Sequence, residues 1–116
     1  MKIEKAKPSN HLVLSELTKR SKAFWGYSQK QIEEWDEQLT VSEKYIIENE
    51  VYTLEGEKKI IGYYSFYPID EKKVKLDNIF ILPEFIRKKY GSYLMTDFLS
   101  RVKKGEFSVV TLNSDP

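Results

Sequence analysis

The stretch that limits the possible folds most strongly lies in the second half of the chain. Residues 74–82 alternate in polarity, which predicts a long central strand, and Pro83 ends this strand because proline cannot donate to the hydrogen-bond ladder. Helical spacing begins near Arg87 and stops at Gly105, and residues 107–112 then predict a last strand. A strand, a helix and a strand in this order predict a right-handed crossover between two parallel strands.

Each face of the central strand carries a polar residue next to apolar neighbours, Asn78 on one face and Asp77 on the other. Strict alternation assigns Val74, Leu76, Asn78 and Phe80 to one face and Lys75, Asp77, Ile79 and Ile81 to the other. In the helix that follows, the predicted apolar face consists of Leu94, Met95, Phe98, Leu99 and Val102.

The first half of the chain predicts a strand over residues 2–7, followed by two helices. Pro8-Ser9-Asn10 starts the first helix, whose apolar stripe consists of Leu12, Val13, Leu17 and Phe24. Ser28-Gln29-Lys30-Gln31 is a capping-box pattern that starts the second helix, whose stripe consists of Ile32, Trp35 and Leu39.

Residues 50–55 and 59–67 are rich in tyrosine and β-branched residues, and the short polar stretch between them predicts an antiparallel hairpin. The complete order is a strand, two helices, three antiparallel strands, a helix and a parallel strand. This order predicts an α+β fold with a mixed, mostly antiparallel sheet. We expect residues 1–116 to form a single domain.

Charge and composition exclude several kinds of site. The chain has 19 Lys and Arg residues against 18 Asp and Glu residues, so its overall field would not attract nucleic acid or an anionic membrane. It has no cysteine and a single histidine, His11, so we expect neither a thiolate nucleophile nor a metal site. Its apolar runs are far shorter than the roughly 20 residues of a membrane span, and its start does not resemble a secretory signal, so a cytoplasmic protein is expected.

The turn between the central strand and the next helix contains three consecutive cations, Arg87, Lys88 and Lys89. Helix N-termini favour negative charge, so a bound anion would relieve this conflict, and Gly91 would let a phosphate approach the main chain. The alternative interpretation is a solvated basic surface turn. The turn matches neither the phosphate loop of nucleotide hydrolases nor the glycine pattern of dinucleotide-binding domains.

Residues 76–91, LDNIFILPEFIRKKYG, resemble the acetyl-CoA site of the GNAT N-acetyltransferases. In that family a strand and a proline precede a Gln/Arg-x-x-Gly-x-Gly/Ala turn into a helix. Here Gly91 matches the last position, while Ile86 and Lys89 stand where Gln/Arg and the first glycine are usual. Residues 21–27 are similar to a segment between the first two helices in one bacterial branch of the family.

The resemblance implies a fold and a cofactor as well as a reaction. It implies that acetyl-CoA is the co-substrate and that a small-molecule or peptide primary amine is acetylated by direct attack. Main-chain groups of Phe80 and Ile81 would hold pantetheine and polarise the acetyl carbonyl, and amides from about Lys88 to Ser92 would hold the pyrophosphate. The implied cofactor-binding set is Phe80, Ile81, Ile86, Arg87, Lys88, Lys89, Tyr90, Gly91 and Ser92.

Other residues are candidates for the acceptor side of the site, each with a structural alternative. Asp77 and Asn78 could orient an amine or a water, or could serve as structural hydrogen-bonding groups. Trp25 and Tyr27 could line an acceptor pocket or belong to the core, and Asn113 could contact substrate or form a turn. No residue is assigned as the general acid.

The family continues into another helix and closing strands, so the resemblance implies a domain that is incomplete at its C-terminus. Residues 107–112 would then form an apolar edge strand, which a second copy of the chain could cover as a homodimer. A competing hypothesis is a non-catalytic CoA-binding or interaction module that dimerises through this strand. A small RNA-binding domain is a third, less favoured hypothesis because of the balanced charge.

Overall fold

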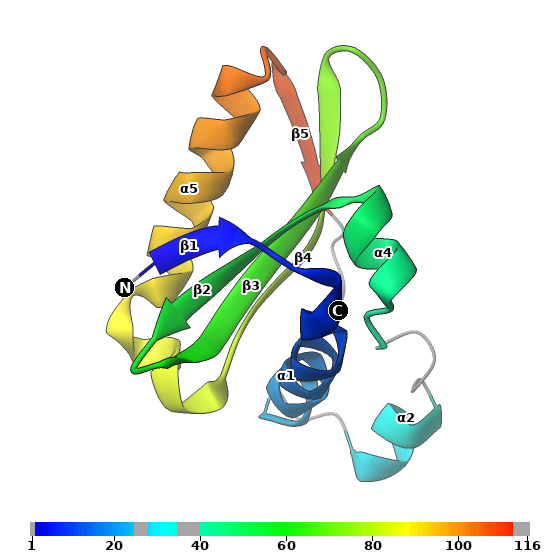
Figure 1. The fold of residues 1–116 in the computed structure, drawn as a ribbon, viewed down its shortest axis with the longest axis vertical. Helices are drawn as coiled ribbons and strands as arrows, with labels where there is room; N and C mark the ends of the chain where they lie inside the picture. Colours follow the sequence, from blue (N-terminus) through cyan, green and yellow to red (C-terminus); the bar gives the residue numbers. More distant parts are fainter. Residues whose placement is uncertain (1, 25–27, 35–39, 113–116) are drawn as a thin grey trace.

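The computed structural model describes residues 2–24, 28–34 and 40–112. The described residues form a five-stranded sheet with strand order β1-β2-β3-β4-β5, in which β5 runs parallel to β4 and the other neighbours are antiparallel (Figure 1). The strands are β1 (Lys2–Lys5), β2 (Glu50–Gly56), β3 (Lys59–Pro68), β4 (Lys73–Ile81) and β5 (Val109–Leu112). The helices are η1 (Pro8–Asn10), α1 (His11–Phe24), α2 (Gln29–Glu34), α4 (Glu43–Glu48), η2 (Pro83–Lys88) and α5 (Tyr90–Lys104), of which η1 and η2 are 3-10 helices. The predicted α+β fold is confirmed.

Helices cover both faces of the sheet, with α1 and α4 on one face and α5 on the other (Figure 1). Two consecutive residues of β3 show this arrangement. The hydroxyl of Tyr63 lies 2.6 Å from that of Thr18 on α1, whereas the hydroxyl of Tyr64 donates a 2.5 Å hydrogen bond to Asp97 on α5. Successive side chains of a strand point to opposite faces, so the two helices lie on opposite sides of β3.

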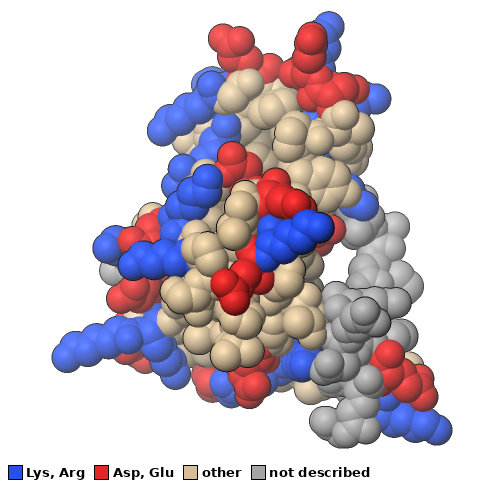
Figure 2. Space-filling view, turned by 45° about the vertical axis from the view of Figure 1, so that its right-hand side comes forward, with Lys and Arg blue, Asp and Glu red and all other residues tan. Residues whose placement is uncertain are grey.

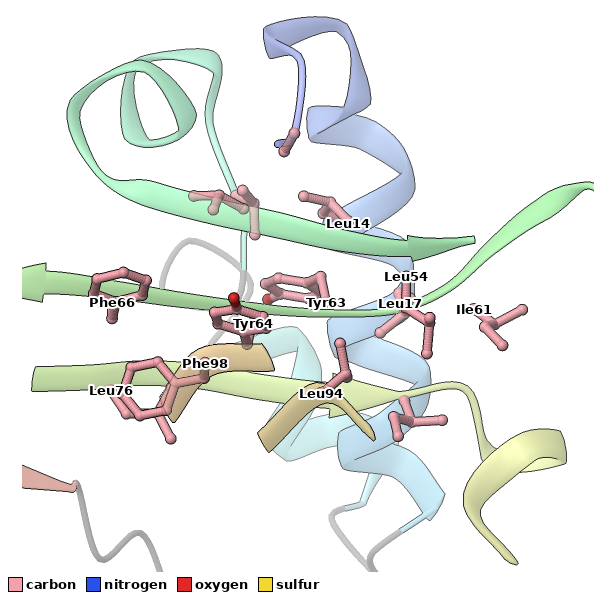
Figure 3. Close-up of a cluster of buried hydrophobic side chains, with 14 of the residues drawn as sticks. Leu14, Leu17, Leu54, Ile61, Tyr63, Tyr64, Phe66, Leu76, Leu94 and Phe98 are labelled. Atoms are coloured by element: carbon pink, nitrogen blue, oxygen red, sulfur yellow. The ribbon is translucent and has the colours of Figure 1, made fainter. Parts of the chain in front are cut away.

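The core lies between the sheet and these helices (Figure 3). From the two helix layers, Leu14 and Leu17 of α1 and Leu94 and Phe98 of α5 are almost completely buried. Burial of one such side chain contributes about 1.5–3 kcal/mol. The central strands β3 and β4 are therefore held from both sides.

Two local predictions are confirmed in atomic detail. The β2–β3 hairpin turns at Glu57 and Lys58, which both have positive φ (54° and 66°), as in the type I′ turn that suits twisted strands. At the start of α2, the Ser28 hydroxyl accepts from the Gln31 amide at 3.1 Å, and the Gln31 side chain accepts from the Ser28 amide at 3.0 Å. Of the stripe predicted for this helix, Trp35 and Leu39 lie outside the described residues.

The apolar stripe predicted for the first helix is wrong. Of its members, only Leu17 is buried, while Leu12, Val13 and Phe24 are 71%, 46% and 52% exposed. The buried face of α1 consists of Leu14, Ser15, Leu17, Thr18 and Ser21. Hydroxyl residues can occupy this face because carbonyl groups accept their protons, as the Leu14 carbonyl does for Thr18 at 2.8 Å.

The face predicted for the last helix is also partly wrong, since Leu99 is 50% exposed while Leu94, Phe98 and Val102 are buried. This helix begins at Tyr90 and not near Arg87, because Pro83–Lys88 form a 3-10 helix first. The first strand ends at Lys5, and the last strand begins at Val109.

The short helix α4 was not predicted. It has only six residues, too few for a periodic pattern, and its N-cap Ser42 accepts a hydrogen bond from the Tyr45 amide at 3.0 Å. The buried Ser15 hydroxyl accepts a 2.7 Å hydrogen bond from the Val41 amide, which ties the segment before α4 to α1. The position of α4 therefore depends on α1 as well as on its own cap.

On the face shown in Figure 2, positive and negative side chains are interspersed. Within the described residues, no helix combines the length and the apolar character needed to cross a bilayer.

Candidate functional site

The site is built around an irregularity in β4. On β3, Ser65 pairs with Asn78 and the next residue, Phe66, pairs with Leu76, so Asp77 is an extra residue in β4. Such a β-bulge bends the strand and re-aims the side chains on either side of it. Strict alternation along β4 is therefore broken at Asp77.

The faces predicted for this strand by strict alternation are wrong, because the bulge shifts the side chains that follow it. Leu76 is opposite Phe66, whose ring contacts Phe98 of α5 with centroids 5.2 Å apart, so Leu76 faces α5. Phe80 is opposite Tyr63, whose hydroxyl reaches α1, and their ring centroids are 5.9 Å apart. Leu76 and Phe80 thus lie on opposite faces, although alternation predicts that they share one.

The same bulge brings Asp77 and Asn78 together in one polar cluster with Tyr45 of α4 and Ser65 of β3. The Tyr45 hydroxyl donates a short hydrogen bond to Asp77 Oδ2 and lies 2.8 Å from Ser65 Oγ. Asn78 Nδ2 donates to Ser65 Oγ at 3.0 Å and to the Tyr45 oxygen at 3.3 Å. Ser65 is fully buried, whereas Asp77 and Asn78 are partly exposed.

Tyr45 keeps its proton in this cluster. Burial, followed by the hydrogen bond to Asp77, raises the pKa of Tyr45 above its ordinary value of 10.0. Burial likewise raises the pKa of the neighbouring Tyr63. Both hydroxyls therefore stay neutral at physiological pH, and the Tyr45 hydroxyl stays a donor to Asp77.

Beyond the bulge, one edge of β4 lacks a strand partner within the described part of the chain. Within the described residues, the parallel β4–β5 ladder runs from Lys73 to Leu76, which pairs with Leu112. From Asn78 to Ile81, the strand pairs with β3, and no other described strand pairs with it. Among the described residues, main-chain groups of this segment, including those of Phe80 and Ile81, therefore have no strand partner on the other edge.

The turn after β4 combines a left-handed residue with an open glycine. Lys89 has φ 64° and ψ 16°, a left-handed conformation that glycine adopts most easily, and it is the N-cap of α5. Its side chain makes no capping hydrogen bond to the first-turn amides. Among the described atoms, a Cβ at Gly91 would make one ordinary contact, with Ile81 Cδ1 at 3.7 Å, so the described residues leave room beside Gly91.

Packing and one ion pair hold this turn in place. The Leu82 amide donates to the Ile61 carbonyl at 2.8 Å, and the buried Phe85 contacts Tyr90 with ring centroids 5.8 Å apart. Arg20 of α1 forms a 2.7 Å ion pair with Glu84. The turn is thus connected to β3, to α5 and to α1.

The structure brings the described members of the predicted cofactor-binding set into one continuous path along β4, η2 and the start of α5. In this path Ile86 packs against the core, Tyr90 is half-buried, and Ser92 is exposed. Trp25, Tyr27 and Asn113, the predicted acceptor-side residues, lie outside the described residues.

Two members of the polar cluster, Tyr45 and Ser65, were missed from the sequence. Ser65 lies in a tyrosine-rich segment whose pattern indicates a sheet core. Tyr45 lies in a segment for which the sequence predicts no element, and the Ser42 cap is its local signal for a turn of helix. Within the ranges that the structure describes, no three His, Cys, Asp or Glu residues are grouped to hold a metal ion.

The family model for acetyltransferases of the GNAT family matches residues 13–116. No curated protein matches the chain in sequence.

Solved structures share the fold. A PaiA N-acetyltransferase from Thermoplasma acidophilum, in complex with coenzyme A, has a TM-score of 0.78 and 22% identity over 89% of this chain and 72% of its own. A GNAT family acetyltransferase from Brucella melitensis, in complex with acetyl-CoA, has a TM-score of 0.75 and 16% identity over 99% of this chain and 76% of its own. For a GNAT family acetyltransferase from Elizabethkingia anophelis with acetyl-CoA bound, the TM-score is 0.56 and the identity 22%; the match covers 73% of this chain and about half, 49%, of that one. The sequence match over most of its length shows that the chain belongs to the GNAT acetyltransferase family.

Proposed function

We propose that this protein is an acetyl-CoA-dependent N-acetyltransferase that transfers the acetyl group to a primary amine by direct attack. The observation that carries the proposal is the left-handed Lys89 followed by Gly91 at the carboxyl end of β4. Lys89 occupies the position of a family glycine and adopts the backbone conformation that glycine favours. The backbone at Lys89 is therefore compatible with the glycine that is usual at this position of the motif.

The start of α5 is suited to a diphosphate. Its first-turn amides receive no side-chain cap from Lys89, and the helix dipole places partial positive charge at this end. A pyrophosphate bound there would accept hydrogen bonds from amides between about Lys88 and Ser92. The cations Arg87, Lys88 and Lys89 would add a favourable charge.

The edge of β4 beyond Leu76, which has no strand partner among the described residues, is suited to the rest of the cofactor. Pantetheine is an extended chain with amide groups, so it can pair with the main chain as a short strand would. In the proposed complex, main-chain groups of Phe80 and Ile81 hold pantetheine and polarise the acetyl carbonyl.

On the acceptor side, Asp77 is the proposed proton acceptor. When the amine nitrogen attacks the thioester carbon and the coenzyme A thiolate leaves, the amine must lose a proton, and a carboxylate within reach can receive it. This direct transfer needs no covalent enzyme intermediate, so a chain without cysteine can perform it. Trp25, Tyr27 and Asn113 remain predicted acceptor-side residues.

Two measurements test the proposal. Isothermal titration calorimetry should show binding of coenzyme A and acetyl-CoA, and a thiol-release assay over a panel of primary amines should show turnover above the rate of acetyl-CoA hydrolysis. Binding without turnover would contradict the proposed enzyme and favour the non-catalytic CoA-binding module that dimerises through residues 107–112. Absence of binding would contradict both.

A charge-reversal variant tests the turn itself. We expect Lys88→Glu combined with Lys89→Glu to weaken coenzyme A binding at least tenfold, because the double change reverses the charge facing the diphosphate. Lys72→Glu combined with Lys73→Glu, where the turn before β4 meets the first residue of the strand, alters the net charge equally and should leave affinity unchanged. Equal affinities for the two double variants would remove the case for a diphosphate at this turn.

A further inference from the structure

The helix α4 presents one side chain, that of Tyr45, to the bulge of β4. Its backbone is fixed at both ends of the helix: the Tyr45 amide donates to Ser42 Oγ at 3.0 Å, and the Tyr45 carbonyl accepts from the Asn49 amide and from Asn49 Nδ2, both at 3.0 Å. A tyrosine held in this way has little freedom to move its hydroxyl. The position of the hydroxyl relative to β4 is therefore set by the fold.

The hydrogen bonds of the polar cluster have one consistent direction. Tyr45 has a single hydroxyl proton, which it donates to Asp77 Oδ2, so its oxygen must accept from Ser65. The Ser65 proton is then used for Tyr45, so the Ser65 oxygen accepts from Asn78 Nδ2. The chain of donors runs from Asn78 through Ser65 and Tyr45 and ends on the carboxylate of Asp77.

This chain of hydrogen bonds ends on only one of the two carboxylate oxygens of Asp77. Tyr45 donates to Asp77 Oδ2, and Asn78 Nδ2 lies 3.5 Å from the same atom. Among the described residues, none donates a hydrogen bond to Asp77 Oδ1. Because Asp77 is only partly buried, a ligand or a water can approach this second oxygen.

We infer that Tyr45 is a positioning residue which, with Ser65 and Asn78, orients Asp77 so that Oδ1 receives the proton of the acceptor amine. The inference rests on the proposed function and adds to it the residues that make Asp77 effective. Asp77 is three residues before Phe80, a separation of about 10 Å along the strand. The acceptor amine and, where needed, one water bridge this distance between the carboxylate and the acetyl carbonyl.

The neutral state of Tyr45 supports this role. Because burial raises its pKa, the hydroxyl remains a donor throughout the physiological range and holds Asp77 in one orientation. Substitution by phenylalanine keeps the ring and removes the shorter of the two hydrogen bonds that described residues donate to Asp77 Oδ2. The carboxylate can then rotate, and a misplaced catalytic group loses rate steeply.

The test compares two tyrosines that each donate to an aspartate but lie on opposite faces of β3 and β4. In Tyr45→Phe we expect kcat for the best amine of the panel to fall about 10- to 100-fold while KM for acetyl-CoA stays unchanged. In the control Tyr64→Phe, which removes the hydrogen bond to Asp97 on the α5 face, we expect kcat within about twofold of the wild type. Similar losses in the two variants, or no loss in Tyr45→Phe, would overturn the inference.

A double-mutant cycle separates positioning from general loss of structure. If Tyr45 acts through Asp77, Asp77→Asn alone lowers kcat about 100-fold or more, and adding Tyr45→Phe lowers it no further. Additive losses would overturn the inference. Ser65→Ala, a smaller change in the same chain, should lower kcat less than Tyr45→Phe, and no loss would exclude the Ser65 link.

The proposed function and this inference fail in different ways. A wild-type chain that acetylates no amine contradicts the proposed function and the inference with it. A wild-type chain that acetylates an amine, together with a Tyr45→Phe variant of equal kcat, contradicts the inference alone. Calorimetry with coenzyme A accompanies each variant, and unchanged affinity shows that the cofactor path along β4 and α5 is intact.

Discussion

Replacing Gly91 by alanine separates a structural role of this glycine from a binding role. Gly91 lies in the first turn of α5, its φ is outside the left-handed region, and an added Cβ would make only an ordinary 3.7 Å contact with Ile81 Cδ1. Nothing in the fold therefore requires glycine here. If the turn binds no ligand, alanine is the better residue at this position.

The expected changes in stability and affinity have opposite signs. Alanine is favoured over glycine within a helix by about 0.8–1 kcal/mol and by less in the first turn, so we expect Gly91→Ala to raise the free energy of unfolding by about 0.5 kcal/mol. For a domain of this size the melting temperature should rise by about 2–3 °C. The new Cβ occupies the open space beside the amides, so coenzyme A should bind at least tenfold more weakly, a loss of about 1.4 kcal/mol.

Thermal unfolding without ligand and calorimetry with coenzyme A measure the two effects on the same sample. Ser100→Ala is the matched control, because it improves helix propensity at an exposed position of α5 away from the turn and should leave affinity unchanged. A Gly91→Ala variant that is more stable and binds coenzyme A as tightly as the wild type would refute the assignment of the turn. A less stable variant would refute the structural part of the reasoning.

Three further predictions concern stability. Lys89→Gly should stabilise the protein, because a left-handed backbone costs a non-glycine residue about 1–2 kcal/mol, while the greater entropy of glycine in the unfolded chain offsets part of this gain. Urea unfolding should therefore show a free energy of unfolding higher by up to about 1 kcal/mol. A lower free energy of unfolding would mean that the Lys89 side chain stabilises the turn. Ser15→Ala leaves the Val41 amide without its 2.7 Å acceptor and should cost about 1–3 kcal/mol in the same assay, whereas a cost below about 0.5 kcal/mol would mean that another acceptor replaces the hydroxyl. At alkaline pH, the free energy of unfolding should be constant below pH 10 and fall above it by up to about 5 kcal/mol per pH unit, because burial raises the pKa of four tyrosines, which reach their ordinary pKa of 10.0 only after unfolding. The four are Tyr45, Tyr52, Tyr63 and Tyr64. Denaturant titrations from pH 9 to 11 measure this slope, each Tyr→Phe change should lower it by up to about a quarter, and a flat profile would contradict the assignment of buried neutral hydroxyls.

The sequence was sufficient where local chemistry determines the structure. The hairpin between β2 and β3 follows from a polar four-residue stretch between two β-rich segments, and the capping box at Ser28 follows from side chains three residues apart. The crossover from β4 through α5 to β5 follows from a change of hydrophobic period from two to 3.6. In each case the interacting residues are close in the sequence or share one period.

Sequence reasoning failed where burial depends on partners that are distant in the chain. Thr18 is a polar residue type and lies outside the predicted stripe, yet it is buried because the Leu14 carbonyl accepts its proton and the Tyr63 hydroxyl reaches it from β3. Leu99 was counted as core, yet α5 turns it to solvent because the sheet is covered by Leu94 and Phe98. A hydrophobicity pattern assigns faces by residue type and contains no information about which hydroxyls will find acceptors.

The bulge at Asp77 marks the limit of what the pattern could show about the site. Sequence reasoning selected Asp77 and Asn78 because they are the polar residues of an apolar strand, but alternation placed them on opposite faces. The extra residue in β4 places both side chains on the same face, where they contact Tyr45. The residues after the bulge therefore lie on the faces opposite those predicted. Within the described residues, the β4–β5 ladder reaches Leu76, directly before the bulge, so the edge proposed for pantetheine and the cluster proposed for the amine begin at neighbouring residues. Binding of the acetyl donor and deprotonation of the acceptor amine would then both depend on the bulge at Asp77, which is visible only in the pairing of β4 with β3.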